Sequence, residues 1–344
     1  MPSTKPLLHI DGSQGEAGGQ IIRTALALSA ITNTPFTIEK IRHNRPKRGL
    51  KTQHLTCVRE LQKLTNATVE GATLGSETLT FTPTQTTIPN ELTINIGTAG
   101  SITLLLQALL PLIIHKQKPC TIHIKGGTNV AWSPPIDYTT NILFPTLTNI
   151  TTITTTIRKR GCYPKGGGHI TLTTQPKQPK PILLTKKGNL ISITGHSFAS
   201  NLLKTKHVAE RTATKAKNTL TKQGHNTIIK TEYTDTESPG SGITLWATYE
   251  HCIIGADTIG ERGKPAEKIG EEAANKLITT INTHATTDPN LTDQLIPYLA
   301  LYTGTITTPK LTNHTKTNIA ITEQFLKKKF IIKEENELYT ILIQ

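Results

Sequence analysis

Hydrophobic and polar residues follow two different periods along the first quarter of the chain. Short runs rich in Ile, Val, Thr and Phe, bounded by turn residues, predict strands at residues 6–10, 36–42, 67–72 and 77–83. Apolar residues spaced three and four positions apart predict helices at residues 20–32 and 52–65. The predicted order of this segment is therefore strand, helix, strand, helix, strand, strand.

The same order of elements recurs twice. In the second copy we expect strands at residues 91–96 and 120–127, helices at 101–115 and 134–150, and a hairpin at 151–174. A third copy at the C-terminus has helices at residues 291–303 and 315–329 and strands at 305–311, 330–335 and 338–344. Gly15 and Gly97 occupy matching turns in the first two copies. Internal repeats of this kind set the architecture of a protein.

The segment between the second and third copies has its own pattern. It follows a stretch rich in Pro and Lys at residues 175–184, which we interpret as a hinge, and it contains a loop at 235–242 that we expect to be mobile. We expect strands at residues 189–198, 227–234 and 243–260 and helices at 207–223 and 265–281. These elements predict a small inserted domain.

The predicted fold class is α/β, of the α+β type. Three βαβαββ repeats form a large domain from residues 1–180 and 287–344, and a small α/β domain at residues 181–286 is inserted before the third repeat.

Composition narrows the class of partner. The formal net charge is +14, which suits a polyanion such as RNA or DNA, although a solvated basic surface explains the charge alone equally well. Aromatic residues make up only 4% of the chain, so any base-stacking surface is small. Four widely spaced cysteines without a C-x-x-C pair indicate neither a zinc site nor a disulfide scaffold. With no apolar run long enough to cross a bilayer and no apolar signal core, a soluble cytoplasmic protein that does not enter membranes is expected.

A glycine-rich stretch, "DGSQGEAGGQIIR", joins the first strand to the first helix. Backbone N–H groups at such a junction bind anions, although an ordinary turn is an equally good interpretation. The stretch matches neither a P-loop nor the G-x-G-x-x-G pattern. Glu16 is a hard oxygen ligand suited to Mg²⁺. Arg23 lies two turns further along, on the same helix face as Glu16.

A basic loop, "IRHNRPKRGLKTQH", follows the second strand. Its cationic side chains are those of Arg42, Arg45, Lys47, Arg48 and Lys51. Arginine binds phosphate oxygens in a bidentate manner, so the loop predicts a phosphate site, with a solvated basic loop as the alternative. A second charged loop, "GERGKPAEKIG", is either a substrate contact or an ordinary helix start.

His314 lies in "PKLTNHTKTNI", immediately before a predicted helix. The positive end of a helix disfavours an imidazolium, and a neutral imidazole can attack phosphorus to form a phosphoramidate. On position alone, a capping or hydrogen-bonding role for His314 is the better interpretation. The chain has no H-E-x-x-H or G-x-S-x-G motif, so neither a zinc protease nor a serine hydrolase is indicated.

Six motifs, taken together, change this interpretation of His314. They are "HIDGSQGEAGGQIIRTALALS", "IRHNRPKRGLKTQHL", "IGTAGSITLLLQALLP", "YPKGGGHI", "DQLIPYLAL" and "HTKTNIAITEQFL". In this order, over nearly the whole chain, they resemble the RNA 3′-terminal phosphate cyclases. The resemblance implies three βαβαββ repeats with a small inserted domain. It also implies ATP-dependent conversion of an RNA 3′-phosphate to a 2′,3′-cyclic phosphate through a histidine–AMP adduct and an adenylated RNA end, with Mg²⁺ or Mn²⁺.

The resemblance also implies roles for individual residues. His314 matches the nucleophile, and Glu16 matches an acidic residue near the metal and the triphosphate. Positions that match phosphate-binding residues are Arg23, Arg42 and Arg45, with Gln53 as a polar partner. Positions that match nucleotide-binding residues are Gln107, Asn290, Leu291, Thr292, Asp293 and Gln294, with Pro134 or Pro135 against one face of the base.

Three positions depart from the family pattern. Ala17 replaces a usual glycine, Arg48 a usual proline, and Asn290 a tyrosine that in many members stacks on adenine. A non-catalytic cyclase-like RNA-binding protein in RNA processing or ribosome assembly is the alternative, and His314 argues against it because such relatives lack the catalytic histidine. A distant similarity to enolpyruvyl transferases concerns the repeated unit only. The sequence predicts neither the oligomeric state nor the physiological RNA.

Overall fold

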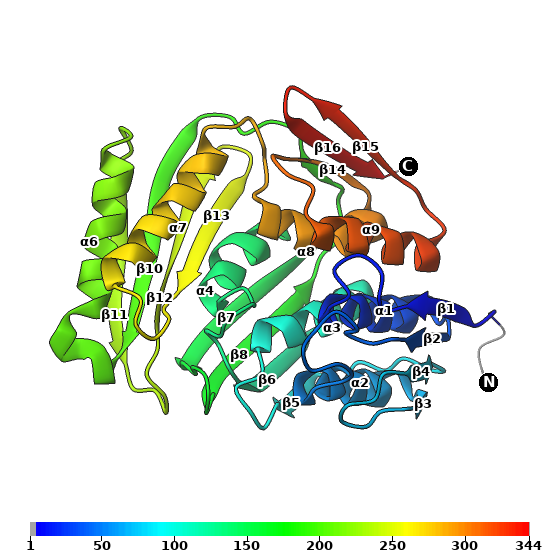
Figure 1. Ribbon diagram of the computed structural model, residues 1–344. Helices are drawn as coiled ribbons and strands as arrows, with labels where there is room; N and C mark the ends of the chain where they lie inside the picture. The colour runs from blue at the N-terminus through cyan, green and yellow to red at the C-terminus, as the bar shows by residue number, and fades with distance from the viewer. Residues whose placement is uncertain (1–4, 344) are drawn as a thin grey trace.

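The computed structural model describes residues 5–343, and it has a mixed α/β fold with four four-stranded sheets (Figure 1). In the first sheet the strand order is β1-β2-β4-β3, with β1 and β2 parallel and the remaining pairs antiparallel. The elements of this segment are β1 (Leu8–Asp11), α1 (Gly19–Thr32), β2 (Phe36–Glu39), α2 (Thr52–Thr65), β3 (Thr68–Glu70) and β4 (Leu79–Thr82).

The second sheet has the same arrangement, in the order β5-β6-β8-β7. Its elements are β5 (Glu91–Asn95), α3 (Ile102–His115), β6 (Cys120–Gly126), α4 (Ile136–Tyr138), η1 (Thr139–Leu143), α5 (Phe144–Thr146), β7 (Thr151–Lys159) and β8 (Gly168–Pro176). The helix predicted at residues 134–150 is thus three consecutive segments with a π-helical middle. Gly15 and Gly97, which match in the sequence, both have a positive φ (58° and 74°) after the first strand of their sheets.

The third sheet, in the order β15-β16-β14-β9, shows the arrangement again. Its elements are β9 (Ile182–Leu184), α8 (Pro289–Tyr302), β14 (Gly304–Thr308), α9 (Asn313–Leu326), β15 (Phe330–Glu335) and β16 (Leu338–Ile343). The short strand β9 was not predicted, because three residues carry no periodic signal and its partner β14 is far away in the sequence. Residues 182–184, which the sequence assigns to the small domain at 181–286, pair in parallel with β14 in the third sheet. Gln344, the end of the last predicted strand, lies outside the described residues.

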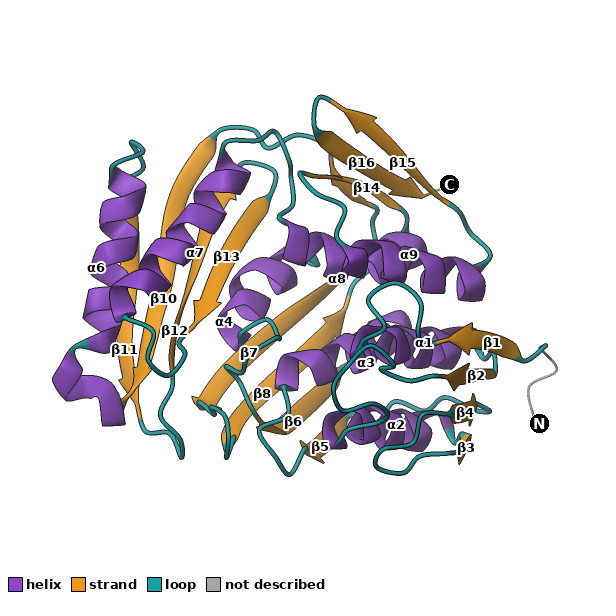
Figure 2. Cartoon of the chain, in the orientation of Figure 1, coloured by secondary structure: helices purple, strands orange, loops and turns teal. Residues whose placement is uncertain are grey.

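The inserted segment forms the fourth sheet, in the order β11-β10-β12-β13, with α6 and α7 over one of its faces (Figure 2). Its elements are β10 (Leu190–Ser200), η2 (Asn201–Lys206), α6 (Val208–Thr221), β11 (Thr227–Thr234), β12 (Ser241–Tyr249), β13 (Ile253–Ile259) and α7 (Ala266–Ile281). Leu245, Ile254 and Leu277 belong to a hydrophobic cluster separate from the main core. The assignment of residues 181–286 to a separate small domain remains a prediction.

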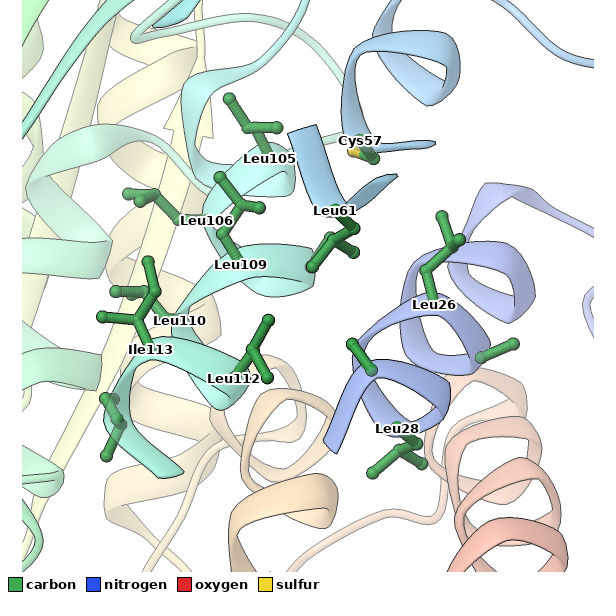
Figure 3. Packing of buried hydrophobic residues seen from close by; sticks show 14 of the residues in the cluster. Leu26, Leu28, Cys57, Leu61, Leu105, Leu106, Leu109, Leu110, Leu112 and Ile113 are labelled. Carbon is green, nitrogen blue, oxygen red and sulfur yellow. The ribbon is translucent and has the colours of Figure 1, made fainter. Parts of the chain in front are cut away.

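The main core lies where the helices of the three repeats meet. Helix α1 packs against α2, α3 and α9, and α8 packs against α9. Figure 3 shows Leu26 and Leu28 of α1 with Leu61 of α2 and Leu105 and Leu109 of α3, and all five side chains are fully buried. Burial of each leucine contributes about 1.5–3 kcal/mol before entropy is counted. This packing fixes the helix N-termini on which the candidate site is built. Among residues 5–343, no helix has the length and apolarity to span a bilayer.

A buried ionic cluster joins the inserted segment to the second repeat. Arg160, after β7, contacts Asp137 of α4 at 2.7 Å and Glu232 of β11 at 3.0 Å. His196 of β10 lies 2.9 Å from Asp137 and 3.0 Å from Glu232. The loop at residues 235–242, expected to be mobile, packs on this interface. Ser238 is 2% exposed, and its Oγ accepts a hydrogen bond from the backbone N–H of Lys165.

The cluster predicts a pH-dependent stability. Burial alone would lower the pKa of His196, but hydrogen bonds to Asp137 and Glu232 outweigh it and raise the pKa to about 9. A raised histidine pKa contributes stability that is complete below the unfolded value and is lost as the pH rises through the folded value. We expect the free energy of unfolding to fall by roughly 1–3 kcal/mol between pH 6.5 and 9 through this group. Urea unfolding of the wild type and His196→Gln across this range measures it. Parallel curves for the two proteins would contradict the assignment.

Candidate active site

His314 is the second residue of α9 and is 43% exposed. The helix begins there because Thr312 is its N-cap and accepts a hydrogen bond at Oγ1 from the backbone N–H of Thr315 (2.9 Å). The imidazole therefore lies at the positive end of a helix and remains open to a ligand.

Helix α1 and the turn before it place two side chains opposite His314. A buried hydrogen bond from Thr24 Oγ1 to Asn318 Oδ1 (2.7 Å) joins α1 to α9. The turn before α1 approaches α9 closely at Gly15, where φ is +58° and a Cβ would lie 2.2 Å from Thr317 Oγ1. Only glycine fits this backbone and this gap. The result is that Glu16 and Gln20 face the His314 ring.

The hydrogen bonds of Gln20 determine which imidazole nitrogen is free. Gln20 Nε2 donates to the backbone carbonyl of His314 (3.3 Å), which turns Gln20 Oε1 toward His314 Nδ1. Because Oε1 is an acceptor, Nδ1 carries the proton, and this tautomer follows from the network. In the neutral ring the lone pair is then on Nε2, which lies on the Glu16 side of the ring, 3.3 Å from Oε2.

This orientation predicts a positioning role for Gln20. Gln20→Leu removes the acceptor for Nδ1–H and lets the ring rotate, so we expect the rate of any reaction at Nε2 to fall roughly 10- to 100-fold. Gln20→Glu keeps an acceptor and should recover most of that loss. Single-turnover kinetics of the two variants, with the KM for nucleotide measured separately, test the role. Equal rates for Gln20→Leu and the wild type would contradict it.

Glu16 is held by Arg45 and by a hydrogen bond to α9. Arg45 Nη2 lies 2.7 Å from Glu16 Oε1, and the backbone N–H of Glu16 donates to Thr317 Oγ1 (3.3 Å). No group of three or more His, Cys, Asp or Glu side chains able to hold a metal occurs in residues 5–343. A single carboxylate still fits Mg²⁺, because this ion is usually bound by one or two carboxylates together with phosphate oxygens and water.

Arg23 and His54 form a buried donor pair beside the start of α1. Arg23 is 8% exposed, its Nε has no hydrogen-bond partner among residues 5–343, and burial lowers its pKa to about 10. Burial and the nearby Arg23 lower the pKa of His54 to about 3, so this ring is neutral. Its Nδ1 accepts from the backbone N–H of Lys51 (3.1 Å), so the proton is on Nε2. His54 Nε2 lies close to Gly19, where an added Cβ would be 2.2 Å from that nitrogen. A buried cation without an anionic partner, a second donor and a helix N-terminus together suit an anion.

The remaining predicted phosphate-binding residues have structural contacts as well. Arg42 has a φ of +56°, and its Nη1 donates to the carbonyl oxygens of Lys47 (2.5 Å) and Gly49 (3.1 Å), which braces the basic loop. Gln53 Oε1 accepts from the backbone N–H of Ser101 (2.7 Å), the N-cap of α3. This bond joins the N-terminal ends of α2 and α3.

The predicted nucleotide-binding segment at the start of α8 is partly inaccessible. Leu291 and Thr292 are fully buried, so their side chains cannot contact a nucleotide. Asn290 is exposed, and Asp293 accepts hydrogen bonds from Thr312 Oγ1 (2.6 Å) and Thr315 Oγ1. Asp293 thus lies against the helix start that carries His314, and burial raises its pKa.

Three further predicted residues flank these helix ends. Gln294 is half-buried, and its Nε2 donates to the carbonyl of Asn290 (3.0 Å). The Pro134 carbonyl accepts from Thr103 Oγ1 (2.7 Å), and Gln107 is half-buried one turn further along α3. Hydrogen bonds thus connect His314 directly to α1. The predicted residues of α2, α3 and α8 lie in the first or second turn of these neighbouring helices.

Comparison with known proteins identifies the family. A family profile described as "RNA 3'-terminal phosphate cyclase" matches residues 14–332. A protein of that name from Pyrococcus furiosus is 44% identical over 330 residues, which is 95% of each chain. Another from Pyrobaculum aerophilum is 43% identical over 343 residues, or 98% of each chain. The chain belongs to the RNA 3′-terminal phosphate cyclase family. The resemblance inferred from the motifs is therefore confirmed.

Within this cyclase chain, several site residues were not predicted from the sequence. They are Gln20, Asn318 and Thr317, all of which lie inside motifs that carry the resemblance. Their signal is their position in the first or second turn of α1 or α9, since helix starts are where this site is assembled. Nothing local distinguishes them, because their partners lie up to 301 residues away in the sequence.

Proposed function

We propose that this chain uses ATP to convert the 3′-phosphate of an RNA into a 2′,3′-cyclic phosphate through a covalent histidine–AMP intermediate. The observation that carries the proposal is the His314 ring. Its Nδ1 is held by Gln20, its side chain is 43% exposed at the start of α9, and its Nε2 lies 3.3 Å from Glu16, the carboxylate that Arg45 contacts.

In the first step, His314 Nε2 attacks the α-phosphorus of ATP. The Nε2–P bond forms, the bond from that phosphorus to the bridging oxygen of pyrophosphate breaks, and pyrophosphate leaves. Gln20 Oε1 accepts the Nδ1–H hydrogen bond, which stabilises the positive charge that develops on the ring. Arg45 and the N-terminal end of α9 favour the added negative charge.

In the second step, an oxygen of the RNA 3′-phosphate attacks the phosphorus of AMP, and the P–Nε2 bond breaks. In the third step, the terminal 2′-OH attacks the 3′-phosphorus and releases its proton to water. The O2′–P bond forms, the P–O bond that joined AMP to this phosphate breaks, and AMP leaves with the electron pair of that bond. Arg23 and His54 Nε2–H are the donors that hold the RNA phosphate, because both are buried and Arg23 has no anionic partner.

Glu16 would hold a Mg²⁺ or Mn²⁺ ion together with phosphate oxygens. Such an ion neutralises charge on the triphosphate. Asp293, Asn290, Gln294, Gln107 and Pro134 would contact the nucleotide, and Leu291 and Thr292 support this surface from within the core.

Cyclisation of a 3′-phosphorylated oligoribonucleotide tests the proposal. We expect a 2′,3′-cyclic end only when both ATP and the divalent ion are present, and no reaction with the same RNA ending in 3′-OH. Binding of the RNA without turnover under these conditions would instead support the non-catalytic RNA-binding alternative.

A further inference from the structure

Two aromatic side chains are exposed on the surface of a chain that has few aromatics. The described residues include ten exposed large apolar or aromatic side chains, and only Trp132 (99% exposed) and Tyr163 (74% exposed) are aromatic. An indole in full contact with water contributes nothing to the core, and both of its faces are available to stack on a ligand.

The loop that carries Trp132 is held rigidly. Trp132 has a φ of +58°, a conformation that is costly for a residue with a side chain. Ser133 Oγ donates to the Val130 carbonyl (2.9 Å), and the Pro134 carbonyl accepts from Thr103 of α3 (2.7 Å). The fold therefore holds the indole away from its surface at a cost in backbone conformation, a combination typical of functional positions.

The loop that carries Tyr163 lies alongside it. Asn129 and Cys162 form a parallel β-bridge, which places the segments preceding Trp132 and Tyr163 next to each other. The Tyr163 loop also packs on the start of α3, since a Cβ on Gly166 would lie 2.8 Å from Ala99 Cα. Both aromatics thus lie on loops that are anchored at the N-terminal end of α3.

This position is continuous with the candidate active site. The same end of α3 is joined to α2 by the Gln53–Ser101 hydrogen bond, and α2 carries His54 beside Arg23. The loop also carries exposed cations. Lys165 is exposed next to Tyr163, and Lys159 lies on the same hairpin, 3.0 Å from Glu237. An RNA whose 3′-phosphate is at Arg23 would reach these loops with its preceding nucleotides.

We propose that Trp132 and Tyr163 form a stacking platform for bases upstream of the RNA 3′ end. The inference rests on the proposed function, since it places the terminal phosphate at Arg23. Aromatic platforms beside cations bind single strands with little sequence preference, because every base has a π-face. This surface would let the enzyme hold the body of an RNA without reading its sequence.

Fluorescence and binding together test the platform. The chain has two tryptophans, Trp132 and Trp246. Tryptophan fluorescence is measured while a 3′-phosphorylated oligoribonucleotide is added without ATP. Quenching in the wild type that disappears in Trp132→Phe comes from Trp132. We expect Trp132→Ala to raise the Kd for this RNA about 10-fold or more, and Trp132→Phe to have a Kd close to that of the wild type. Ile228→Ala, an exposed apolar position on β11 (71% exposed), is the matched control and should bind normally.

The outcomes distinguish failure of the stacking platform from failure of the proposed cyclase function. Unchanged RNA affinity in Trp132→Ala and Tyr163→Ala would overturn the platform, whether or not cyclisation occurs. Quenching by ATP alone, with a raised KM for ATP in Trp132→Ala and unchanged RNA affinity, would also overturn it and assign the indole to adenine. Normal adenylation of Trp132→Ala with weakened RNA binding is the expected result, whereas absence of adenylation in the wild type would refute the proposed function.

Discussion

Replacement of His314 by alanine is expected to lower ATP-dependent cyclisation by at least about 1,000-fold. The other site groups only bind or orient in this account, so none of them replaces the Nε2 lone pair. Arg23 remains charged at neutral pH because its pKa is about 10, and Glu16 is paired with Arg45. Single-turnover cyclisation of a labelled RNA 3′-phosphate measures the effect.

The variant should fold normally, because His314 is 43% exposed and the polar contacts of its side chain with the described residues are those to Gln20 and Glu16. His251→Ala, at an exposed histidine in the turn between β12 and β13, is the matched control and should keep full activity. Cyclisation by His314→Ala within tenfold of the wild type would mean that another group carries the chemistry.

Arg23→Met is expected to lower activity and raise stability at the same time. Loss of the guanidinium removes a buried donor to the phosphoryl group, which should reduce single-turnover cyclisation about 100- to 1,000-fold. Burial lowers the pKa of Arg23 to about 10, so the charged form is less favourable in the folded protein than in the unfolded chain at any pH below that value. Removing the charge while keeping an unbranched side chain should raise the free energy of unfolding by roughly 1–3 kcal/mol at pH 7.

The prediction is specific because activity is expected to fall while the free energy of unfolding rises. A damaged fold would lower activity and stability together, whereas an anion site built at the expense of folding gives less activity and a higher urea midpoint. Arg59→Met, at an exposed arginine of α2, should change neither quantity. If Arg23→Met were less stable than the wild type, the guanidinium would have a stabilising partner, and the phosphate site would have to be placed elsewhere.

Sequence patterns predicted the helices better than the boundaries of the strands. Helix α3 was predicted because its leucines recur on every face, as expected of a buried helix. The strand predicted at residues 36–42 ends at Glu39, because Lys40 and Arg42 adopt positive φ values of 53° and 56° that no local pattern signals. Strand β9 was missed because the strand with which it pairs, β14, is more than 100 residues away.

In the candidate site, too, some features were predictable from the sequence and others depend on how the helices pack. The motifs singled out Glu16, Arg23 and His314, since their residue types and helix-start positions are visible in the sequence. Burial of Arg23 without an anionic partner and the orientation of His314 by Gln20 depend on how α1 packs against α2 and α9. The ionic cluster between Asp137, Arg160, His196 and Glu232 likewise arises only when the inserted segment meets the second repeat.

The covalent adduct is the central claim, and peptide mapping by tandem mass spectrometry tests it most directly. The protein is incubated with ATP and the divalent ion without RNA, digested at neutral or alkaline pH to preserve a phosphoramidate, and sequenced. We predict one AMP group, on His314, that is lost in mild acid and is absent from His314→Ala. AMP on a lysine or another histidine, or an adduct that persists in His314→Ala, would contradict the account.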